Sequence, residues 1–152
     1  MKATVNALSL AVDDVERAMR FYRDGLGLST PGIIGTEFVA DQDNPGGTVA
    51  MFTLDNGMLL SVYGRTDLAT DAGVPLERVT GSAASLGWFV DSRDEVDRVL
   101  ARAAAAGGTI VRAPLTRPWG IYAGYFADPD GHLWEVVYFL DGNRPDRPAT
   151  TQ

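Results

Sequence analysis

The residue with the clearest potential for chemistry is Glu135, which lies near the C-terminus within residues 124–139. This stretch begins with strand-prone aromatic residues, continues through a turn sequence at residues 128–131, and ends in a segment that alternates like a second strand. Glu135 stands in that strand between Trp134 and Val136. A carboxylate in this setting is either a solvated residue on the outer face of a sheet or a functional group in a cavity. In a cavity it could act as a general base or hydrogen-bond a ligand.

Few other residues offer catalytic chemistry. The single histidine, His132, precedes Glu135 by three residues, which along a strand places the two on opposite faces. We interpret it as a surface histidine of the turn. With one histidine and no serine positioned beside it, the chain gives no support for a Ser-His-Asp triad. The absence of cysteine excludes disulfides, thiolate metal ligands and a cysteine nucleophile.

The overall composition limits the class of protein. The chain has 152 residues, of which 45% are hydrophobic, enough for one compact domain or two small fused modules. A net charge of −7 argues against nucleic-acid binding, which requires a basic surface. No apolar run is long enough to span a membrane, and the N-terminus is too weakly hydrophobic for a signal peptide. We expect a cytoplasmic protein that binds neither nucleic acid nor membrane.

The elements that would position Glu135 form two similar halves. In the first half, residues 4–12 predict a strand, and Asp13 with Glu16 predicts a capped helix that ends at Gly25. Further strands are predicted at residues 37–40, 48–54 and 58–63, the last two joined by a hairpin turn at residues 55–57. This gives β-α-β-β-β over residues 1–64.

The pattern then repeats. Residues 65–83 are predicted to form a polar linker, after which residues 84–90 predict a strand and Ser92 with Glu95 predicts a second capped helix. The remaining strands of β-α-β-β-β over residues 84–140 are predicted at 109–112, 121–127 and 132–139. The tail, residues 141–152, is expected to be mobile or to lie on a partner. Together the two modules predict one compact α+β domain.

Motifs in both modules resemble those of a known superfamily. Residues 11–28 read AVDDVERAMRFYRDGLGL, and residues 126–136 read FADPDGHLWEV. With the two β-α-β-β-β modules, these motifs resemble the vicinal oxygen chelate superfamily over residues 4–140. The superfamily includes glyoxalase I, extradiol dioxygenases, fosfomycin resistance enzymes and bleomycin resistance proteins. The resemblance implies an open, curled, barrel-like mixed sheet with helices on its outer face and a ligand on its concave face.

The resemblance also indicates where a metal ion would bind. Metal-dependent members place His or Glu near the start of each module's first strand and in its last strand. These positions fall near Ala7, Ser61, Ser85 and Glu135 in this chain. Only Glu135 binds a divalent metal ion well, whereas Zn, Ni, Mn and Fe require several such ligands. We therefore expect a protein without a metal ion or another cofactor.

An organic ligand would occupy the concave face, where small residues leave space. These residues are Ala7, Ser9, Ser61, Ser85 and Gly87. Trp88 and Trp134 alternate away from this face and are predicted to lie between sheet and helix. Residues 117–122 predict an exposed loop whose Trp119 and Tyr122 could contact a ligand or a dimer partner. The predicted ligand-binding residues are Leu59, Ser61, Tyr63, Phe89, Trp119, Tyr122, Tyr125 and Glu135, with Val137 beside them. The alternative is that aromatic side chains here simply fill the barrel.

These features lead to a functional hypothesis. We expect a metal-independent protein that binds and sequesters an aromatic or antibiotic-like small molecule, as the drug-binding resistance proteins do. The resemblance also implies a homodimer, and no catalytic residue is assigned. The alternative is a lyase, isomerase or dioxygenase in which Glu135 is a metal ligand or a general base. A third interpretation is a scaffold or regulatory domain with a vestigial cleft.

Overall fold

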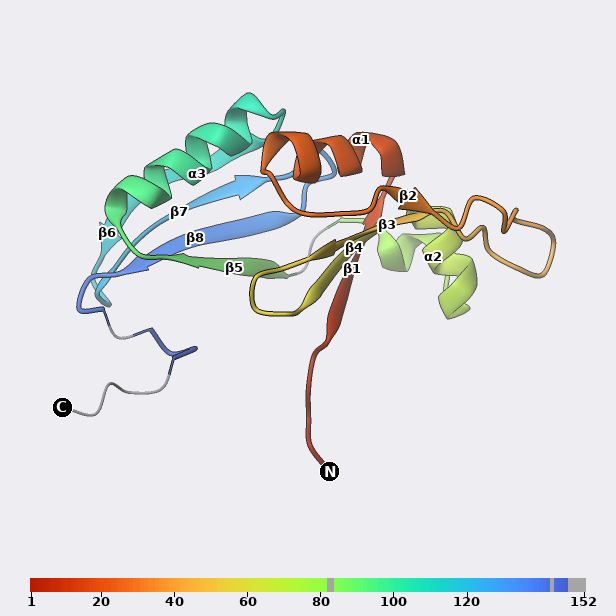
Figure 1. The fold of residues 1–152 in the computed structure, drawn as a ribbon, viewed down its shortest axis with the longest axis horizontal. Coiled ribbons are helices and arrows are strands. Elements are labelled where there is room, and N and C mark those ends of the chain that lie inside the picture. The colour runs from red at the N-terminus through yellow and green to blue at the C-terminus, as the bar shows by residue number, and fades with distance from the viewer. Residues whose placement is uncertain (82–83, 143, 148–152) are drawn as a thin grey trace. The chain divides into compact units, whose positions relative to one another are not determined.

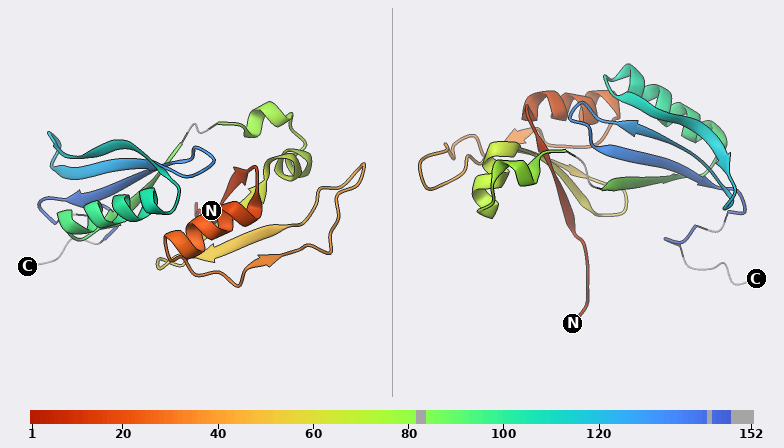
Figure 2. Two further views of the ribbon diagram at one scale, coloured as in Figure 1. Left: turned by 90° about the horizontal axis from the view of Figure 1, so that it is seen from above. Right: turned by 180° about the vertical axis from the view of Figure 1, so that it is seen from behind.

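The computed structural model describes residues 1–81, 84–142 and 144–147. The chain divides into two units, Met1–Gly81 and Ser82–Gln152, and each is described by itself. Each unit contains a four-stranded mixed sheet with a helix on one face (Figure 1, Figure 2). The predicted α+β class is confirmed. Among the described residues, neither sheet closes into a barrel by itself.

The first unit follows the predicted β-α-β-β-β order. Its sheet has the strand order β1-β4-β3-β2, in which β1 and β4 are parallel and the other neighbours antiparallel. The predicted hairpin turn joins β3 to β4, and the Gly57 amide donates to the Leu54 carbonyl. The elements are β1 (Ala7–Val12), α1 (Val15–Arg20), a π-helical turn (Phe21–Gly25), β2 (Ile33–Ile34), β3 (Val49–Thr53), β4 (Leu59–Gly64), α2 (Arg65–Ala72) and a 3-10 turn (Leu76–Val79).

The first helix begins one residue later than predicted. Asp14 is the N-cap, and its carboxylate accepts a 3.0 Å hydrogen bond from the Arg17 amide. Asp13, the predicted cap, instead accepts a hydrogen bond from the Arg65 side chain at the start of α2. Adjacent aspartates offer the same capping chemistry, so the sequence alone does not select between them.

One face of the first sheet packs against α1. Tyr22 follows α1 in the same helical stripe, is fully buried, and places its ring 5.7 Å from that of Phe52. With Ala18 and Met19 of α1, which are also buried, it forms an apolar stripe that packs on the sheet. The buried strand residues on this face are Leu10, Val12, Ala50, Phe52, Leu60 and Val62.

Two predictions for this unit differ from the structure. The strand predicted at residues 37–40 is wrong, because the second strand is Ile33–Ile34 and the predicted residues belong to the loop that follows. Residues 65–83, predicted to be a linker, contain α2, which ends at Gly73 with φ 68°. The sequence conceals this helix because it buries only Ala69 and so lacks an apolar stripe.

The second unit repeats the order of the first, as predicted. Its strand order is β5-β8-β7-β6, with β5 and β8 parallel. The predicted cap of α3 is present, since the Glu95 amide donates to the Ser92 hydroxyl over 3.1 Å. The strand predicted at residues 109–112 extends to Arg117, with register shifts along its length. The elements are β5 (Ser85–Val90), α3 (Arg93–Ala105), β6 (Thr109–Arg117), β7 (Ile121–Ala127) and β8 (Leu133–Phe139).

The turn between β7 and β8 places His132 inside the fold. The Asp128 carboxylate accepts hydrogen bonds from the Asp130 and His132 amides, both at 2.9 Å. The His132 side chain is only 7% exposed. The interpretation of His132 as a surface residue is wrong because the aspartate-stabilised turn folds the chain back toward the sheet before β8 begins.

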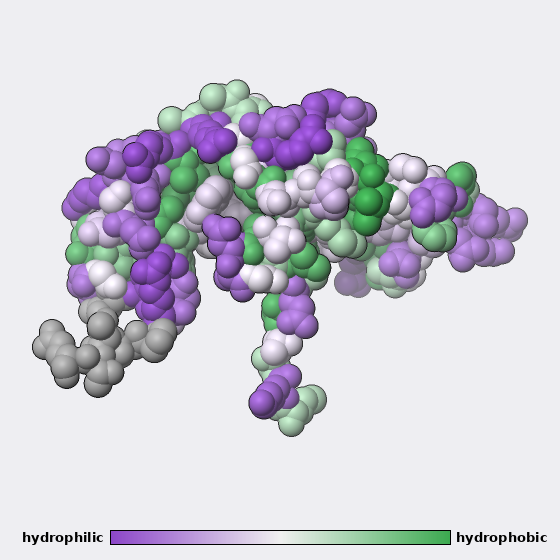
Figure 3. Space-filling view, in the orientation of Figure 1, coloured by the Kyte–Doolittle hydropathy of each residue, from purple (hydrophilic) through white to green (hydrophobic). Residues whose placement is uncertain are grey.

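The helix α3 covers one face of the second sheet (Figure 1). On that face, Trp134 stacks on Phe126 with ring centroids 5.8 Å apart and meets Trp88 edge-on at 6.0 Å. Both tryptophans thus lie on the helix-covered face, as predicted. Hydrophilic side chains cover most of the outward side of α1 and of α3, except at the C-terminal end of α3 (Figure 3). The buried residues of α3 are Val96, Leu100 and Ala103.

Candidate functional site

Each sheet has a second face that its helix does not cover, which we call the open face. Cross-strand partners share a face, so the strand registers identify its residues. In the first unit these include Ala7, Ser9, Val49, Met51, Leu59, Ser61 and Tyr63. In the second unit they include Ser85, Gly87, Phe89, Arg112, Leu115, Arg117, Ile121, Ala123, Tyr125, Glu135, Val137 and Phe139.

The open face of the first unit carries a pair of hydroxyl groups. Ser9 and Ser61 are direct partners in β1 and β4, and their Oγ atoms are 2.6 Å apart. Two residues along β4, the Tyr63 hydroxyl donates a 2.6 Å hydrogen bond to the Gly46 carbonyl. Burial and then the charge of Asp67 raise the pKa of Tyr63. The Tyr63 hydroxyl therefore anchors the loop that precedes β3, while the Ser9–Ser61 pair remains the polar feature of the sheet itself.

On the open face of the second unit, the predicted residues Glu135 and Tyr125 lie together. They are direct partners in β8 and β7, and Gly87 of β5 flanks Glu135 on its other side. Burial, followed by hydrogen bonding to the Glu135 carboxylate and by the charge of that carboxylate, raises the pKa of Tyr125. The phenol and the carboxylate form one half-buried polar pair.

The edge strand β6 contributes two arginines to this face, Arg112 beside the pair and Arg117 toward the other end of the sheet. Arg112 is the cross-strand partner of Tyr125, and Arg117 is the partner of Ile121 on the same face. The charge of Arg117, and less strongly that of Arg112, lowers the pKa of Tyr125 against the larger opposing causes. The Arg117 guanidinium carbon also lies 4.5 Å from the centroid of the Trp119 ring, whose residue is 64% exposed. Trp119 is thus presented at the margin of the open face.

The other end of this face is filled by apolar side chains. Ile121, Ala123 and Val137 are buried, and Phe89 meets Phe139 edge-on with ring centroids 4.9 Å apart. The Phe89 ring also lies over Gly87, because a Cβ added there would meet its Cε1 at 3.3 Å. The space that Gly87 was expected to leave is therefore partly occupied by Phe89.

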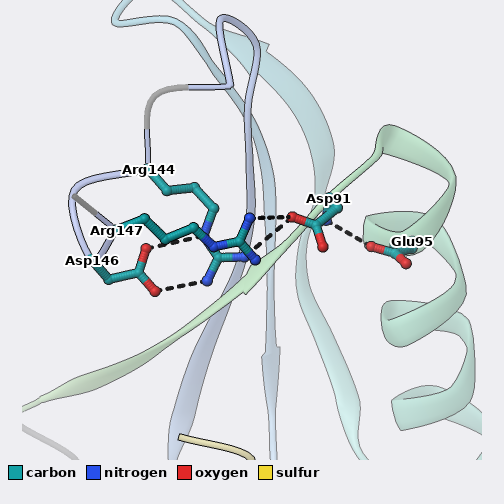
Figure 4. A network of polar contacts seen from close by, with 5 residues as sticks. All are labelled: Asp91, Glu95, Arg144, Asp146 and Arg147. Carbon is teal, nitrogen blue, oxygen red and sulfur yellow. Dashed lines mark hydrogen bonds and ion pairs between the residues drawn. The ribbon is translucent and has the colours of Figure 1, made fainter. Parts of the chain in front are cut away.

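The C-terminal segment lies against the same end. The Arg144 guanidinium carbon is 5.6 Å from the centroid of the Phe89 ring. It also forms ion pairs with Asp91 and Asp146, and Arg147 joins it on Asp91 (Figure 4). Part of the predicted tail is thus held beside α3. Residues 143 and 148–152 of that tail lie outside the described residues.

Tyr122 is not brought together with Glu135. Its hydroxyl donates a 2.7 Å hydrogen bond to Asp97 of α3, and the Arg93 guanidinium lies 4.9 Å from its ring centroid. The hydrogen bond to Asp97 is the main cause that raises the pKa of Tyr122. Tyr122 and Glu135 therefore belong to opposite faces of the sheet.

Sequence reasoning missed the arginines of the open face. It ended the strand at residue 112, so it assigned no face to Arg117. Strand alternation alone would not have placed both arginines, because the register shifts between Ile110 and Leu115 break the two-residue period. The signal that could have found them is their positive charge. In a chain with a net charge of −7, two arginines close together in the sequence could have been noticed as a basic feature.

The metal ion that many vicinal oxygen chelate proteins bind does not fit these residues. Of the positions that would carry its ligands, Ala7 offers a methyl group, Ser61 and Ser85 offer neutral hydroxyls, and only Glu135 offers a carboxylate. Within residues 1–81, 84–142 and 144–147, no three histidine or acidic side chains come close enough to hold a metal ion. The donor set lacks the imidazoles and carboxylates that such an ion prefers.

A family model described as the glyoxalase/bleomycin resistance protein/dioxygenase superfamily matches residues 4–136. The chain belongs to this superfamily. The two β-α-β-β-β units and the Asp128 turn before Glu135 are thus features of a glyoxalase-superfamily member. The comparison with curated proteins gives no match. In the described part of this member, no helix has the length and apolarity needed to cross a bilayer.

Solved structures of the superfamily share the fold. A glyoxalase-related enzyme from Fulvimarina pelagi is 29% identical, with a TM-score of 0.71 over 89% of this chain and 87% of that one. A glyoxalase/bleomycin resistance protein/dioxygenase from Nocardioides is 23% identical, with a TM-score of 0.72 over 98% and 91%. A lactoylglutathione lyase from Agrobacterium tumefaciens is 24% identical, with a TM-score of 0.64 over 91% and 95%. At 23% and 24% identity, the latter two similarities show the fold alone.

Proposed function

We propose that this glyoxalase-superfamily member binds a planar, largely apolar small molecule on the open face of its second unit, and that it does so without a metal ion. The observation that supports this most is the arrangement around Glu135. The half-buried Tyr125–Glu135 pair lies beside apolar residues, and Trp119 is exposed at the margin of the same face, where Arg117 lies over its ring. An apolar surface with few polar anchors and an available aromatic ring is typical of small-molecule sites.

Sequestration requires tight, stoichiometric binding and no chemical change in the ligand. Stacking and burial of an aromatic ring supply much of the required free energy, and one hydrogen-bonded anchor sets the orientation. The proposed contacts in the second unit are Trp119, Tyr125 and Glu135, with Phe89 as the wall of the site. Leu59, Ser61 and Tyr63, which were also predicted to bind the ligand, lie on the open face of the first unit. Tyr122 is left out because it faces α3. We further propose that the ligand is antibiotic-like, that the protein is a homodimer, and that it is cytoplasmic.

The test combines binding with recovery of the ligand. A panel of aromatic natural products is screened by isothermal titration calorimetry, and each ligand that binds is recovered and examined by mass spectrometry. We expect a stoichiometric complex and unaltered ligand, with weaker binding in Glu135→Gln and in Trp119→Ala. Asp43→Asn, an exposed residue of the loop before β3, is the control and should bind as the unmodified protein does. A chemically altered ligand, or no binding across the panel, would refute sequestration.

A second function is favoured by the Tyr125–Glu135 hydrogen bond. The phenol holds the carboxylate in place on the open face, where it can take a proton from a bound substrate, as a general base does. In that case the protein is a metal-free isomerase or lyase. Turnover that Glu135→Gln abolishes, in a variant with an unchanged circular dichroism spectrum, would establish this function in place of sequestration.

A further inference from the structure

The charge on the open face of the second unit is opposite to that of the chain. The protein carries a net charge of −7. On the open-face positions of β5 to β8, however, the charged side chains are Arg112, Arg117 and Glu135, which gives a local excess of one positive charge. A site that attracts cations would show the reverse balance. The local charge therefore complements an anion.

The guanidinium groups of these two arginines are not neutralised within the described part of the chain. Arg112 is exposed and forms no ion pair there, and the Arg117 guanidinium lies over the Trp119 ring. Arg144 differs, because its guanidinium is shared between Asp91 and Asp146 and lies over Phe89. Arg144 thus holds the C-terminal segment in place, whereas Arg112 and Arg117 remain able to bind an anion.

The neighbours of Arg117 define the kind of anion. On one side it lies over the exposed Trp119 ring, which offers a stacking surface. On the other side its charge acts on Tyr125, whose hydroxyl is bonded to Glu135. Glu135 would repel a doubly charged group such as a phosphate more strongly than a single carboxylate, which would bring the local balance of charge to about zero. The ring and the guanidinium together match an aromatic ring with one carboxylate.

We propose that the ligand of the second unit is an aromatic carboxylate, with its anionic group on Arg117 and Arg112 and its ring against Trp119. This inference rests on the proposed function, because it names the chemical class of the molecule bound at the same site. The bidentate donors of arginine match a carboxylate, and removal of one charged partner typically weakens such a contact by roughly tenfold or more.

The experiment compares two probes that differ only in charge, naphthalene-2-carboxylate and naphthalene-2-carboxamide, by isothermal titration calorimetry on the full chain. We expect the carboxylate to bind roughly tenfold or more tightly than the amide, with a preference that declines as salt is added. Arg117→Gln and Arg112→Gln should reduce this preference, and the double variant should remove it. Arg98→Gln, on the exposed side of α3, is the matched control and should retain it.

The outcomes separate the two proposals. Equal binding of both probes would overturn the inference and leave aromatic-ligand binding intact. A preference for the carboxylate that survives in the Arg112→Gln/Arg117→Gln variant would overturn the assignment to these arginines. Binding of neither probe would contradict both proposals. Both substitutions lie on an edge strand and keep a polar side chain with an aliphatic stem. Thermal unfolding of each variant identifies any loss of binding that comes from misfolding.

Discussion

At the scale of single residues, the Tyr125–Glu135 pair explains how an acidic side chain is kept within a strand rich in aromatic and β-branched residues. Strand pairing sets the two side chains opposite each other, so the phenol satisfies one acceptor of the carboxylate. The same pairing sets Ser9 against Ser61 in the first unit. Each open face thus carries a polar pair at its β-ladder, one neutral and one charged.

The Tyr125–Glu135 pair makes the free energy of unfolding depend on pH in the alkaline range. Because the pKa of Tyr125 is raised above its ordinary value of 10.0, the folded state retains the phenol proton more strongly than the unfolded state does. The contribution is therefore complete below this value and is lost as pH rises through the higher pKa of the folded protein. Urea unfolding from neutral pH to about pH 11 should show a smaller alkaline decline in Tyr125→Phe. Glu135→Gln should lie between the two proteins, since burial continues to act. An unchanged decline in Tyr125→Phe would contradict the raised pKa, and an unchanged decline in Glu135→Gln would contradict the role of the pairing.

The sequence predicted Glu135 and Tyr125 well because both stand in strands with an unbroken two-residue period. The serine pair was placed on one face for the same reason. Arg117 could not be placed, since a strand with register shifts has no fixed relation between spacing and face. His132 was misplaced because its position depends on hydrogen bonds to the Asp128 carboxylate, which a propensity for turns does not specify.

At the scale of elements, Gly124 allows α3 and the bulged β6 to approach β7. A Cβ at this position would lie 2.6 Å from Leu100 Cδ1 and 3.0 Å from the Arg112 carbonyl oxygen. The backbone of β6 cannot yield as a flexible side chain can, so Gly124→Ala should lower the free energy of unfolding by about 1 to 3 kcal/mol in urea denaturation. Gly87→Ala is the control: its nearest neighbour is the edge of the Phe89 ring, and its cost should be smaller. If both substitutions lower the free energy of unfolding equally, the close approach of the β6 backbone is not what excludes a larger residue at position 124.

The C-terminal segment should be held mainly by Arg144. This side chain is 14% exposed, contacts Phe89 and pairs with two aspartates, whereas Arg147 is 58% exposed. Exposed ion pairs contribute little, while a shielded cation beside an aromatic ring contributes about 1 kcal/mol. Arg144→Met should accordingly accelerate amide hydrogen exchange at residues 144–147, and Arg147→Met should have less effect. If both variants exchange at the same rate, the shielded contact is not what fixes the segment.

At the scale of the whole molecule, the internal repeat was the most predictable property. Two capped helices, two hairpin turns and alternating strands specify β-α-β-β-β twice, and the structure has that order in both units. The helix α2 and the short strand β2 were not predicted, because neither has a repeating pattern of apolar residues long enough to indicate a helix or a strand. Local sequence patterns thus predicted the architecture. Features that depend on side-chain hydrogen bonds could not be predicted from those patterns.

The predicted homodimer is the property of the whole molecule that is simplest to measure. Sedimentation equilibrium should give a mass of twice the 16.3 kDa chain. Exposed apolar residues on the edge strand β6, Ile110, Val111 and Leu115, are available to a second copy. Val111→Glu should lower the dimer fraction, and Thr116→Glu, on the same strand, serves as the comparison. A monomer at every concentration would exclude the dimer.

The tryptophans also determine what optical methods can observe. All three are in the second unit: Trp134 and Trp88 in the aromatic core beneath α3, and Trp119 at the exposed margin. Fluorescence excited selectively at tryptophan therefore follows the second unit, and the opening of Met1–Gly81 passes unseen in that signal. Far-ultraviolet circular dichroism, in contrast, averages over the backbone of both halves. A mismatch between these spectroscopic transitions is thus the signature by which separate melting of the halves can be recognised.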